Sequence, residues 1–169
     1  MKIFLIGFMG CGKTTMANML SYELKYPVID LDITIEESQR MSIAKIFSKK
    51  GEEYFRKIES RELRKIDERE AIIACGGGTP CYNENMNWIN ENGLSVYLKV
   101  NEKKLFERLT RVRATRPMIA GMSDKQLKEF IRSKMIEREP FYSQAKIIVP
   151  LDEISFEELL DELSLHLSF

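Results

Sequence analysis

The feature that most constrains the fold of this chain is a glycine-rich run, Gly7-Phe8-Met9-Gly10-Cys11-Gly12-Lys13-Thr14. It matches the phosphate-loop pattern G-x-x-x-x-G-K-S/T at every fixed position. The apolar residues 3–6 before it are typical of a buried strand in a parallel sheet. Apolar residues after it recur at helical spacing: Met16, Ala17, Met19, Leu20 and Leu24. The strand, the glycine loop and the helix therefore stand in the order that the motif requires.

The residue types in this loop suit the phosphates of a nucleotide. Glycines let the backbone curl until successive N–H groups point at one anion, and the start of the next helix adds partial positive charge. In such loops the lysine, here Lys13, reaches the β- and γ-phosphates, and the hydroxyl of Thr14 is offered to Mg²⁺. The alternative is a glycine-rich turn followed by a chance Lys-Thr pair, and the flanking strand and helix argue against it. Cys11 is interpreted as the filler of a position that needs a small residue.

Composition limits the classes of function. The chain has 26 basic and 26 acidic residues, and the resulting zero net charge argues against a general electrostatic grip on nucleic acid or on a membrane surface. No apolar run approaches the ~18 residues of a spanning helix. The 169 residues favour a single domain, 1–169. Cys11, Cys75 and Cys81 lack metal-binding spacing, so reduced thiols and a cytoplasmic location are expected.

Strand and helix patterns alternate along the whole chain. Further strands are predicted at 28–32, 71–75, 94–100 and 147–149, and helices at 33–39, 42–47, 52–67, 83–92, from 101 onward, from 123 to about 140, and from 155 onward. This alternation is typical of an α/β domain with three layers, α/β/α, around a parallel five-stranded sheet.

Two acids end the second predicted strand. On a strand that continued through them, Asp30 and Asp32 would share one face at the edge where ligands of α/β sheets gather. One acid would then hold Mg²⁺ through water, and the other would accept a proton or a hydrogen bond from a hydroxyl. The alternative is that one of them only caps the helix at 33–39. Many phosphate-loop enzymes carry a metal-binding Asp after the strand that corresponds to 71–75. No acid follows that strand here, so Asp30 is the best candidate for the metal.

Three further stretches admit both a structural and a functional interpretation. Arg56 and Glu59 are spaced for a surface salt bridge, which the spacing alone favours over an arginine clamp on a substrate carboxylate. Gly76-Gly77-Gly78 suggests close approach of the backbone to a ligand, or a flexible turn. The basic stretch 110–121, with Pro117 and Gly121, is typical of a mobile lid or of a solvated loop.

Several separated pieces resemble shikimate kinase, in the order of that family and over most of the chain. They are the phosphate loop, Asp30-x-Asp32, Gly51-Glu52-x-x-Phe55-Arg56-x-x-Glu59, Gly76-Gly77-Gly78, Arg116-Pro117 and Arg138-Glu139-Pro140-Phe141-Tyr142. The phosphate loop is common to many kinases. The Phe-Arg-x-x-Glu helix followed by the triple glycine is far more specific.

The resemblance implies a nucleoside-monophosphate-kinase-like fold with sheet order 2-3-1-4-5. It implies transfer of the ATP γ-phosphate to the 3-hydroxyl of shikimate, giving shikimate 3-phosphate and ADP on the way to chorismate and aromatic amino acids. It also implies a monomer with a shikimate-binding segment at about 32–60 and a lid at about 110–123. For Arg56, it favours the arginine clamp on a substrate carboxylate over the surface salt bridge.

The resemblance also implies roles for single residues. Those implied to bind shikimate are Asp32, Arg56, Gly76, Gly77, Gly78 and Arg138. Those implied to hold ATP are Gly10, Cys11, Gly12, Lys13, Thr14, Thr15 and Arg116. Thr14 and Asp30 serve Mg²⁺, and Lys13, Asp32 and Arg116 are the catalytic candidates.

The chain departs from the family at three places. Cys11 stands where the family more often has Ala or Ser. The lid before Arg116 aligns poorly, so Arg108 and Arg111 both stay candidates for contact with adenine. The loop near Asp152 carries no residue that can be assigned.

Two other functions remain open from the sequence alone. A gluconate-kinase-like enzyme would share the loop and the fold, but should lack the pairing of Arg56 with a triple glycine. A regulatory NTPase would need base-recognition and switch motifs, and the sequence has neither N-K-x-D nor D-x-x-G.

Overall fold

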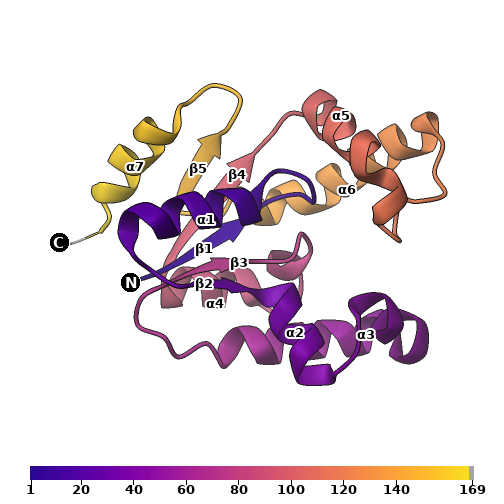
Figure 1. Ribbon diagram of the computed structural model, residues 1–169, viewed down its shortest axis with the longest axis horizontal. Helices are drawn as coiled ribbons and strands as arrows, with labels where there is room; N and C mark the ends of the chain where they lie inside the picture. The colour runs from indigo at the N-terminus through magenta and orange to yellow at the C-terminus, as the bar shows by residue number, and fades with distance from the viewer. Residues whose placement is uncertain (168–169) are drawn as a thin grey trace.

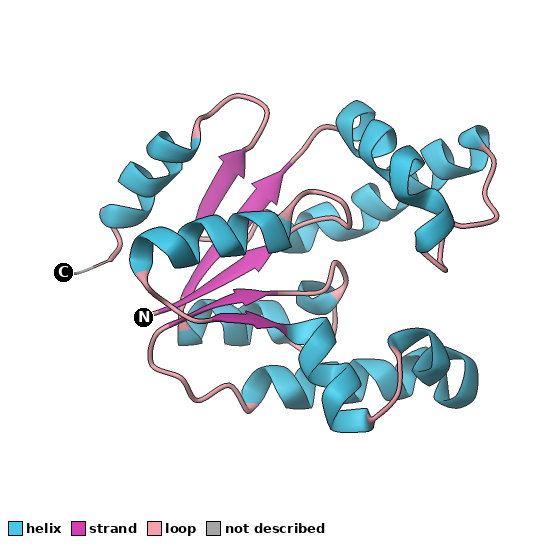
Figure 2. Ribbon diagram, in the orientation of Figure 1, coloured by secondary structure: helices cyan, strands magenta, loops and turns pink. Residues whose placement is uncertain are grey.

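The computed structural model describes residues 1–167 and shows a five-stranded sheet between layers of helices (Figures 1 and 2). The strands are β1 (Lys2–Ile6), β2 (Val28–Asp30), β3 (Ala71–Ala74), β4 (Leu94–Lys99) and β5 (Ile147–Pro150). Their order is β2-β3-β1-β4-β5, and every neighbouring pair is parallel. This confirms the predicted sheet order.

Helices connect the strands. They are α1 (Lys13–Leu24), α2 (Leu31–Gln39), α3 (Ile43–Arg64), α4 (Asn85–Asn92), α5 (Glu102–Val112), α6 (Asp124–Tyr142) and α7 (Phe156–Ser164), with short 3₁₀ helices η1 (Thr79–Cys81) and η2 (Arg113–Thr115). Among the described residues, no helix combines the length and the apolar content that crossing a membrane requires.

The two faces of the sheet bury separate apolar clusters, as alternation along a strand requires. On β1, Ile3 and Leu5 pack with α1, α5 and α7, whereas Phe4 and Ile6 pack with α2, α3 and α4. The expected three-layer α/β/α arrangement is therefore confirmed, and Figure 2 shows the helices above and below the strands.

Strand β2 is shorter than the sequence suggests. Asp30 is the N-cap of α2: its Oδ1 accepts hydrogen bonds from the backbone N–H of Asp32 (3.0 Å) and of Ile33 (3.3 Å). Because the chain turns helical at Leu31, the predicted strand through residue 32 is wrong, and the two acids do not share a strand face. Asp32 instead lies in the first turn of α2.

Two helices end at residues other than those predicted. Gly51 has φ 81° and ψ 169°, so it interrupts α3 as predicted, but α3 ends at Arg64 instead of residue 67. Helix α6 runs through Pro140 to Tyr142, so the predicted end near Pro140 is wrong. Pro140 removes one N–H, but it lies on the exposed face, where water can serve the freed carbonyl. The full burial of Tyr142 on the opposite face favours one more turn.

Candidate active site

A cavity of about 420 Å³ opens at the carboxyl ends of the strands, beside β1, where the order of strand connections reverses. It brings together most of the predicted site residues. Those that line it are Gly10, Gly12, Lys13, Thr14, Thr15, Asp30, Asp32, Gly76, Gly77 and Arg116, together with Arg108. Four predicted site residues are not in its wall: Cys11, Arg56, Gly78 and Arg138. Arg56 lies next to Gly78, and Arg138 lies next to Gly77.

The phosphate loop has the conformation that its glycines permit. Gly10 and Gly12 have φ values of 80° and 107°, in the left-handed region that disfavours side chains. Lys13 folds into the loop, and its Nζ donates to the carbonyls of Gly7 (2.8 Å) and Phe8 (3.0 Å). This places a cation beside the loop amides at the start of α1.

Cys11 contributes to this loop through its backbone. Its side chain is buried in the apolar cluster that contains α1, and its Sγ lies 3.0 Å from where a Cβ on Gly7 would be. The position therefore needs a small side chain, as predicted. All three cysteines are free.

The structure separates the two arginines left open for adenine. Nη1 of Arg108 donates to the carbonyls of Cys11 (2.8 Å) and Gly10 (3.4 Å), so this side chain lies on the phosphate loop. Arg111 is exposed and makes no side-chain hydrogen bond or ion pair within residues 1–167.

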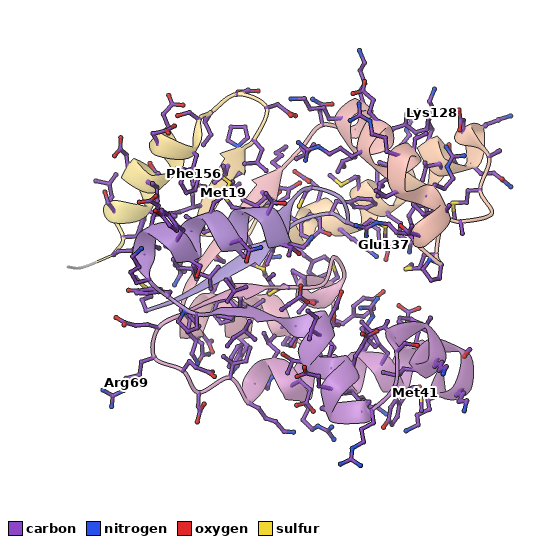
Figure 3. The ribbon with its side chains drawn as sticks, in the orientation of Figure 1. Met19, Met41, Arg69, Lys128, Glu137 and Phe156 are labelled. Atoms are coloured by element: carbon purple, nitrogen blue, oxygen red, sulfur yellow. The ribbon has the colours of Figure 1, made fainter. Side chains whose placement is uncertain are left out.

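A second cavity of about 450 Å³ adjoins the outer side of the phosphate loop. Its wall is slightly more apolar than polar, and Met19 of α1 and Phe156 of α7, both labelled in Figure 3, line it. Leu151 lines it as well. Its neighbour Asp152 is a structural residue, because it accepts from the N–H of Asn101 (3.0 Å) and pairs with Lys104 (2.6 Å).

Asp30 and Asp32 both line the main cavity, but their carboxyl groups have different surroundings. One oxygen of Asp30 is used by the helix cap, and Thr14 lines the same cavity. A hydroxyl and a carboxylate are suitable Mg²⁺ ligands, since Mg²⁺ usually keeps several waters and takes one or two protein carboxylates plus phosphates. For Asp32, burial raises the pKa to about 6; the charges of Asp30 and Glu59 add to this, and Lys13 opposes it.

Arg138 is a buried cation without a counter-ion. Only 4% of it is exposed, its Nε has no hydrogen-bond partner, and no carboxylate pairs with it among the described residues. Its Nη1 lies 3.2 Å from where a Cβ on Gly77 would be. An unpaired guanidinium is costly to bury, so this position suits an anionic ligand.

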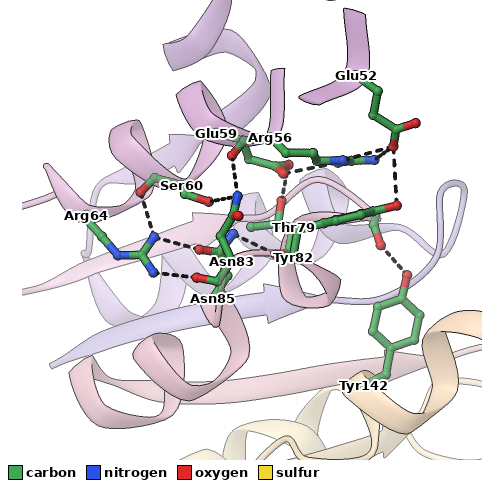
Figure 4. Close-up of polar contacts among 11 residues, drawn as sticks. Glu52, Arg56, Glu59, Ser60, Arg64, Thr79, Tyr82, Asn83, Asn85 and Tyr142 are labelled. Carbon is green, nitrogen blue, oxygen red and sulfur yellow. Dashed lines mark hydrogen bonds and ion pairs between the residues drawn. The ribbon is translucent and has the colours of Figure 1, made fainter. Parts of the chain in front are cut away.

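Arg56 is held by two carboxylates, as Figure 4 shows. Its Nη1 donates to Glu59 (3.1 Å), and its Nη2 donates to Glu52 (2.9 Å). The predicted Arg56–Glu59 salt bridge is therefore present, but it is not a surface pair, because Glu59 is only 1% exposed. Burial lowers the pKa of Arg56, yet the two glutamates outweigh this effect and the net pKa is raised.

The triple glycine leaves room for the protein's own side chains. A Cβ on Gly78 would lie 2.7 Å from Nη1 of Arg56, and a Cβ on Gly76 would lie 3.1 Å from both Asp32 and Glu59. Gly78 is the N-cap of η1, so the segment leads directly into this short helix. In the structure, side chains of Arg56, Arg138 and the buried acids approach the backbone of these glycines, and the approach of a ligand stays a prediction.

The sequence analysis assigned no role to the polar residues that support this segment. Thr79 donates to Glu59 (2.6 Å), Asn85 donates to the carbonyl of Thr79 (2.9 Å), and the hydroxyl of Tyr142 donates to the carbonyl of Gly77. Only Tyr142 had a usable signal, since it follows Arg138 by four residues and so lies on the same helix face.

The segment 110–123, predicted as a lid, is anchored at Arg113 and Ile119 and is open at Arg116. Ile119 is fully buried, and Arg113 donates to the carbonyl of Met122 (2.8 Å) and pairs with Asp124. Arg116 is exposed and lines the main cavity.

The sheet order and the phosphate loop together define the class of phosphate-loop kinases. A family model described as shikimate kinase matches residues 9–167, and the shikimate kinase of Bacteroides fragilis is 40% identical over 99% of this chain and 98% of its own length. The chain belongs to the shikimate kinase family and is an ATP-dependent phosphotransferase. The match over nearly the whole chain decides against a gluconate-kinase-like enzyme and against a regulatory NTPase.

Solved structures agree with this assignment. The crystal structure of shikimate kinase from Bacteroides thetaiotaomicron superposes with a TM-score of 0.89 at 36% identity, covering 98% of both chains. Shikimate kinase from Acinetobacter baumannii, solved in complex with shikimate, superposes with a TM-score of 0.83 at 28% identity, covering 96% of this chain and 90% of that one.

Proposed function

We propose that this chain phosphorylates the 3-hydroxyl of shikimate with ATP and Mg²⁺, and that Arg138 and Arg56 select the acceptor by its carboxylate. The observation that carries the proposal is the buried guanidinium of Arg138, which lies beside Gly77 and has no carboxylate paired with it among the described residues. A carboxylate would supply the missing counter-ion and accept charge-assisted hydrogen bonds. Gly76 and Gly77, which line the cavity, would let the acceptor ring approach the backbone.

Asp32 is the group proposed to receive the attacking hydroxyl. It lines the cavity between the phosphate loop and the glycine segment, and its raised pKa makes it a better proton acceptor than an ordinary aspartate. Because transfer of a phosphoryl group proceeds through a loose transition state, orienting the hydroxyl is the larger part of this role.

The donor is proposed to lie along the phosphate loop. The loop amides and Lys13 bind the phosphates, Arg116 approaches them from residues 110–123, and adenine enters the second cavity, beside Arg108 and Leu151. Thr14 and Asp30 are proposed to hold Mg²⁺, which when bound offsets the negative charge of the phosphates. These groups supply positioning and electrostatic stabilisation, the main sources of catalysis in this reaction class.

Every side chain that this proposal uses comes from one chain, so we propose a working monomer. The free cysteines suit a reducing compartment, which favours the cytoplasm as its location.

The proposal is tested by ADP release over a panel of hydroxylated acceptors: shikimate, gluconate, glycerol and a shikimate analogue without its carboxylate. We expect shikimate to be the one acceptor of the panel that is turned over efficiently. NMR of its product should show the phosphate on the 3-oxygen. Efficient turnover of gluconate, or phosphate on another oxygen, would contradict the proposal.

A further inference from the structure

Tyr82 contacts the acceptor arginine although neither the motif pattern nor the family resemblance assigns it a role. The centre of its ring lies 4.2 Å from Cζ of Arg56, and Figure 4 shows the ring beside the guanidinium. A cation at this distance from an aromatic face is attracted by the ring and shielded from water on that side.

The hydroxyl of Tyr82 acts on the same arginine by a second route. It donates to Oε1 of Glu52 (3.3 Å), the atom that also accepts from Nε (3.2 Å) and Nη2 (2.9 Å) of Arg56. The side chain of Glu52 is 54% exposed, and an exposed ion pair alone restrains an arginine weakly. The bond from Tyr82 gives that carboxylate a second anchor.

The turn that carries Tyr82 is tied to the helix that carries Arg56. Nδ2 of Asn83 donates to the carbonyl of Arg56 (3.0 Å) and to Oγ of Ser60 (3.0 Å), while Arg64 donates to the carbonyl of Asn83 (2.9 Å). Asn83 and Glu84 both have positive φ, a conformation that is unfavourable for residues with side chains. The turn therefore keeps an unfavourable backbone in a position fixed against α3.

The remaining donors of Arg56 fit one carboxylate. Glu52 occupies Nε and one N–H of Nη2, and Glu59 occupies one N–H of Nη1. Within the described part of the chain, one N–H on each terminal nitrogen stays available, next to Gly78. Two donors on one planar group match the two oxygens of a carboxylate.

We propose that Tyr82 is a positioning residue that sets the specificity of the acceptor site for a carboxylate. Its ring fixes the plane of the Arg56 guanidinium and removes water from one face, and its hydroxyl holds Glu52 against the outer edge. This inference rests on the proposed role of Arg56 in binding the carboxylate of shikimate.

Steady-state kinetics of Tyr82→Ala and Tyr82→Phe test it. Tyr82→Ala should raise KM for shikimate about five- to thirtyfold, because the stacked cation loses its cover, while kcat and KM for ATP change less than about threefold. Tyr82→Phe keeps the ring and should recover most of the loss. Tyr82→Leu fills the space without an aromatic ring. It is the variant to measure if Tyr82→Ala does not fold. Tyr22→Ala is the matched control, since Tyr22 has Lys25 over its ring (4.4 Å) but is exposed on α1, and it should change nothing.

A double-mutant cycle with Arg56→Ala decides whether Tyr82 acts through Arg56. On the Arg56→Ala background, Tyr82→Ala should change KM for shikimate by less than about twofold. The same large effect on both backgrounds, or an equal rise in KM for ATP, would overturn the inference and leave Tyr82 a structural residue. If Arg56→Ala itself leaves KM for shikimate unchanged, it is the proposed role of Arg56 that fails.

Discussion

Asp32 carries its carboxyl group where a negative charge is disfavoured. Burial is the main cause, and Asp30 and Glu59 add like charge, so the pKa rises from 3.8 to about 6 although Lys13 lowers it. The group therefore changes protonation at a pH where most aspartates are fully ionised.

The first prediction concerns the pH dependence that follows. If ionised Asp32 accepts the hydrogen of the attacking hydroxyl, kcat/KM for shikimate should rise between about pH 5 and pH 7 with an apparent pKa near 6. Asp32→Asn should lose most of kcat at every pH, and its kcat/KM should not rise between about pH 5 and pH 7. A wild-type profile that is flat across this range contradicts the role given to Asp32.

Thermal unfolding supplies an independent check on the same residue. The pKa of Asp32 is higher in the folded than in the unfolded protein, so its contribution favours folding below pH 3.8 and is lost as the pH rises through about 6. The gain in Tm from Asp32→Asn over wild type should therefore be larger at pH 7.5 than at pH 5. An equal difference at both pH values would show that the pKa is not raised.

At the scale of elements, the start of α2 combines a structural task with a proposed metal site. Oδ1 of Asp30 caps the helix, and the second carboxylate oxygen is the one available to Mg²⁺. Because Asn caps helices about as well as Asp, Asp30→Asn separates the two tasks.

The second prediction is that Asp30→Asn raises the Mg²⁺ concentration required for half-maximal activity more than it raises KM for shikimate, with Tm nearly unchanged. Asn101→Ala is the control, because Asn101 caps α5 through Lys104 N–H (2.9 Å). It should cost about 1 kcal/mol of stability and leave the Mg²⁺ requirement unchanged. A larger rise in KM for shikimate than in the Mg²⁺ requirement would make Asp30 a substrate residue.

The third prediction concerns residues 110–123. Ile119 is buried while Arg116 is exposed at the cavity, so we expect the segment to close over the phosphates around a fixed point. Nucleotide and shikimate together should slow amide hydrogen exchange across 113–118 more than either ligand alone. Exchange that is unchanged in the ternary complex would reduce this segment to a surface loop.

The elements show why some features could be predicted from the sequence. Ser42, Asn101 and Ser155 stand at the predicted starts of three helices, and in the structure each one caps a helix there. The errors depend on tertiary structure: α6 passes Pro140 because Tyr142 is buried beyond it. In the site, the resemblance named Arg56 and Arg138, but no local pattern shows that Arg138 lacks a counter-ion. The support from Thr79 and Tyr82 likewise arises only when η1 packs on α3.

For the whole molecule, the site is a source of instability. Two arginines and two acids are gathered around three glycines, and Arg138 is buried with no carboxylate paired to it in the described part of the chain. Replacing a buried unpaired charge by an apolar side chain of similar shape is often neutral or stabilising. A protein that keeps such a charge in its interior is expected to use it on a ligand.

The measurement that tests this account most directly compares shikimate with its carboxylate-free analogue in wild type and in Arg138→Met, with Tm recorded for both proteins. We predict that wild type strongly prefers shikimate. In Arg138→Met, Tm should stay equal or rise, and kcat/KM for shikimate should fall about 10- to 150-fold, the loss of one charge-assisted pair of about 1.5–3 kcal/mol, so that most of the preference disappears. A folded Arg138→Met protein that still distinguishes the two acceptors as well as wild type does would contradict the claim that Arg138 binds the carboxylate.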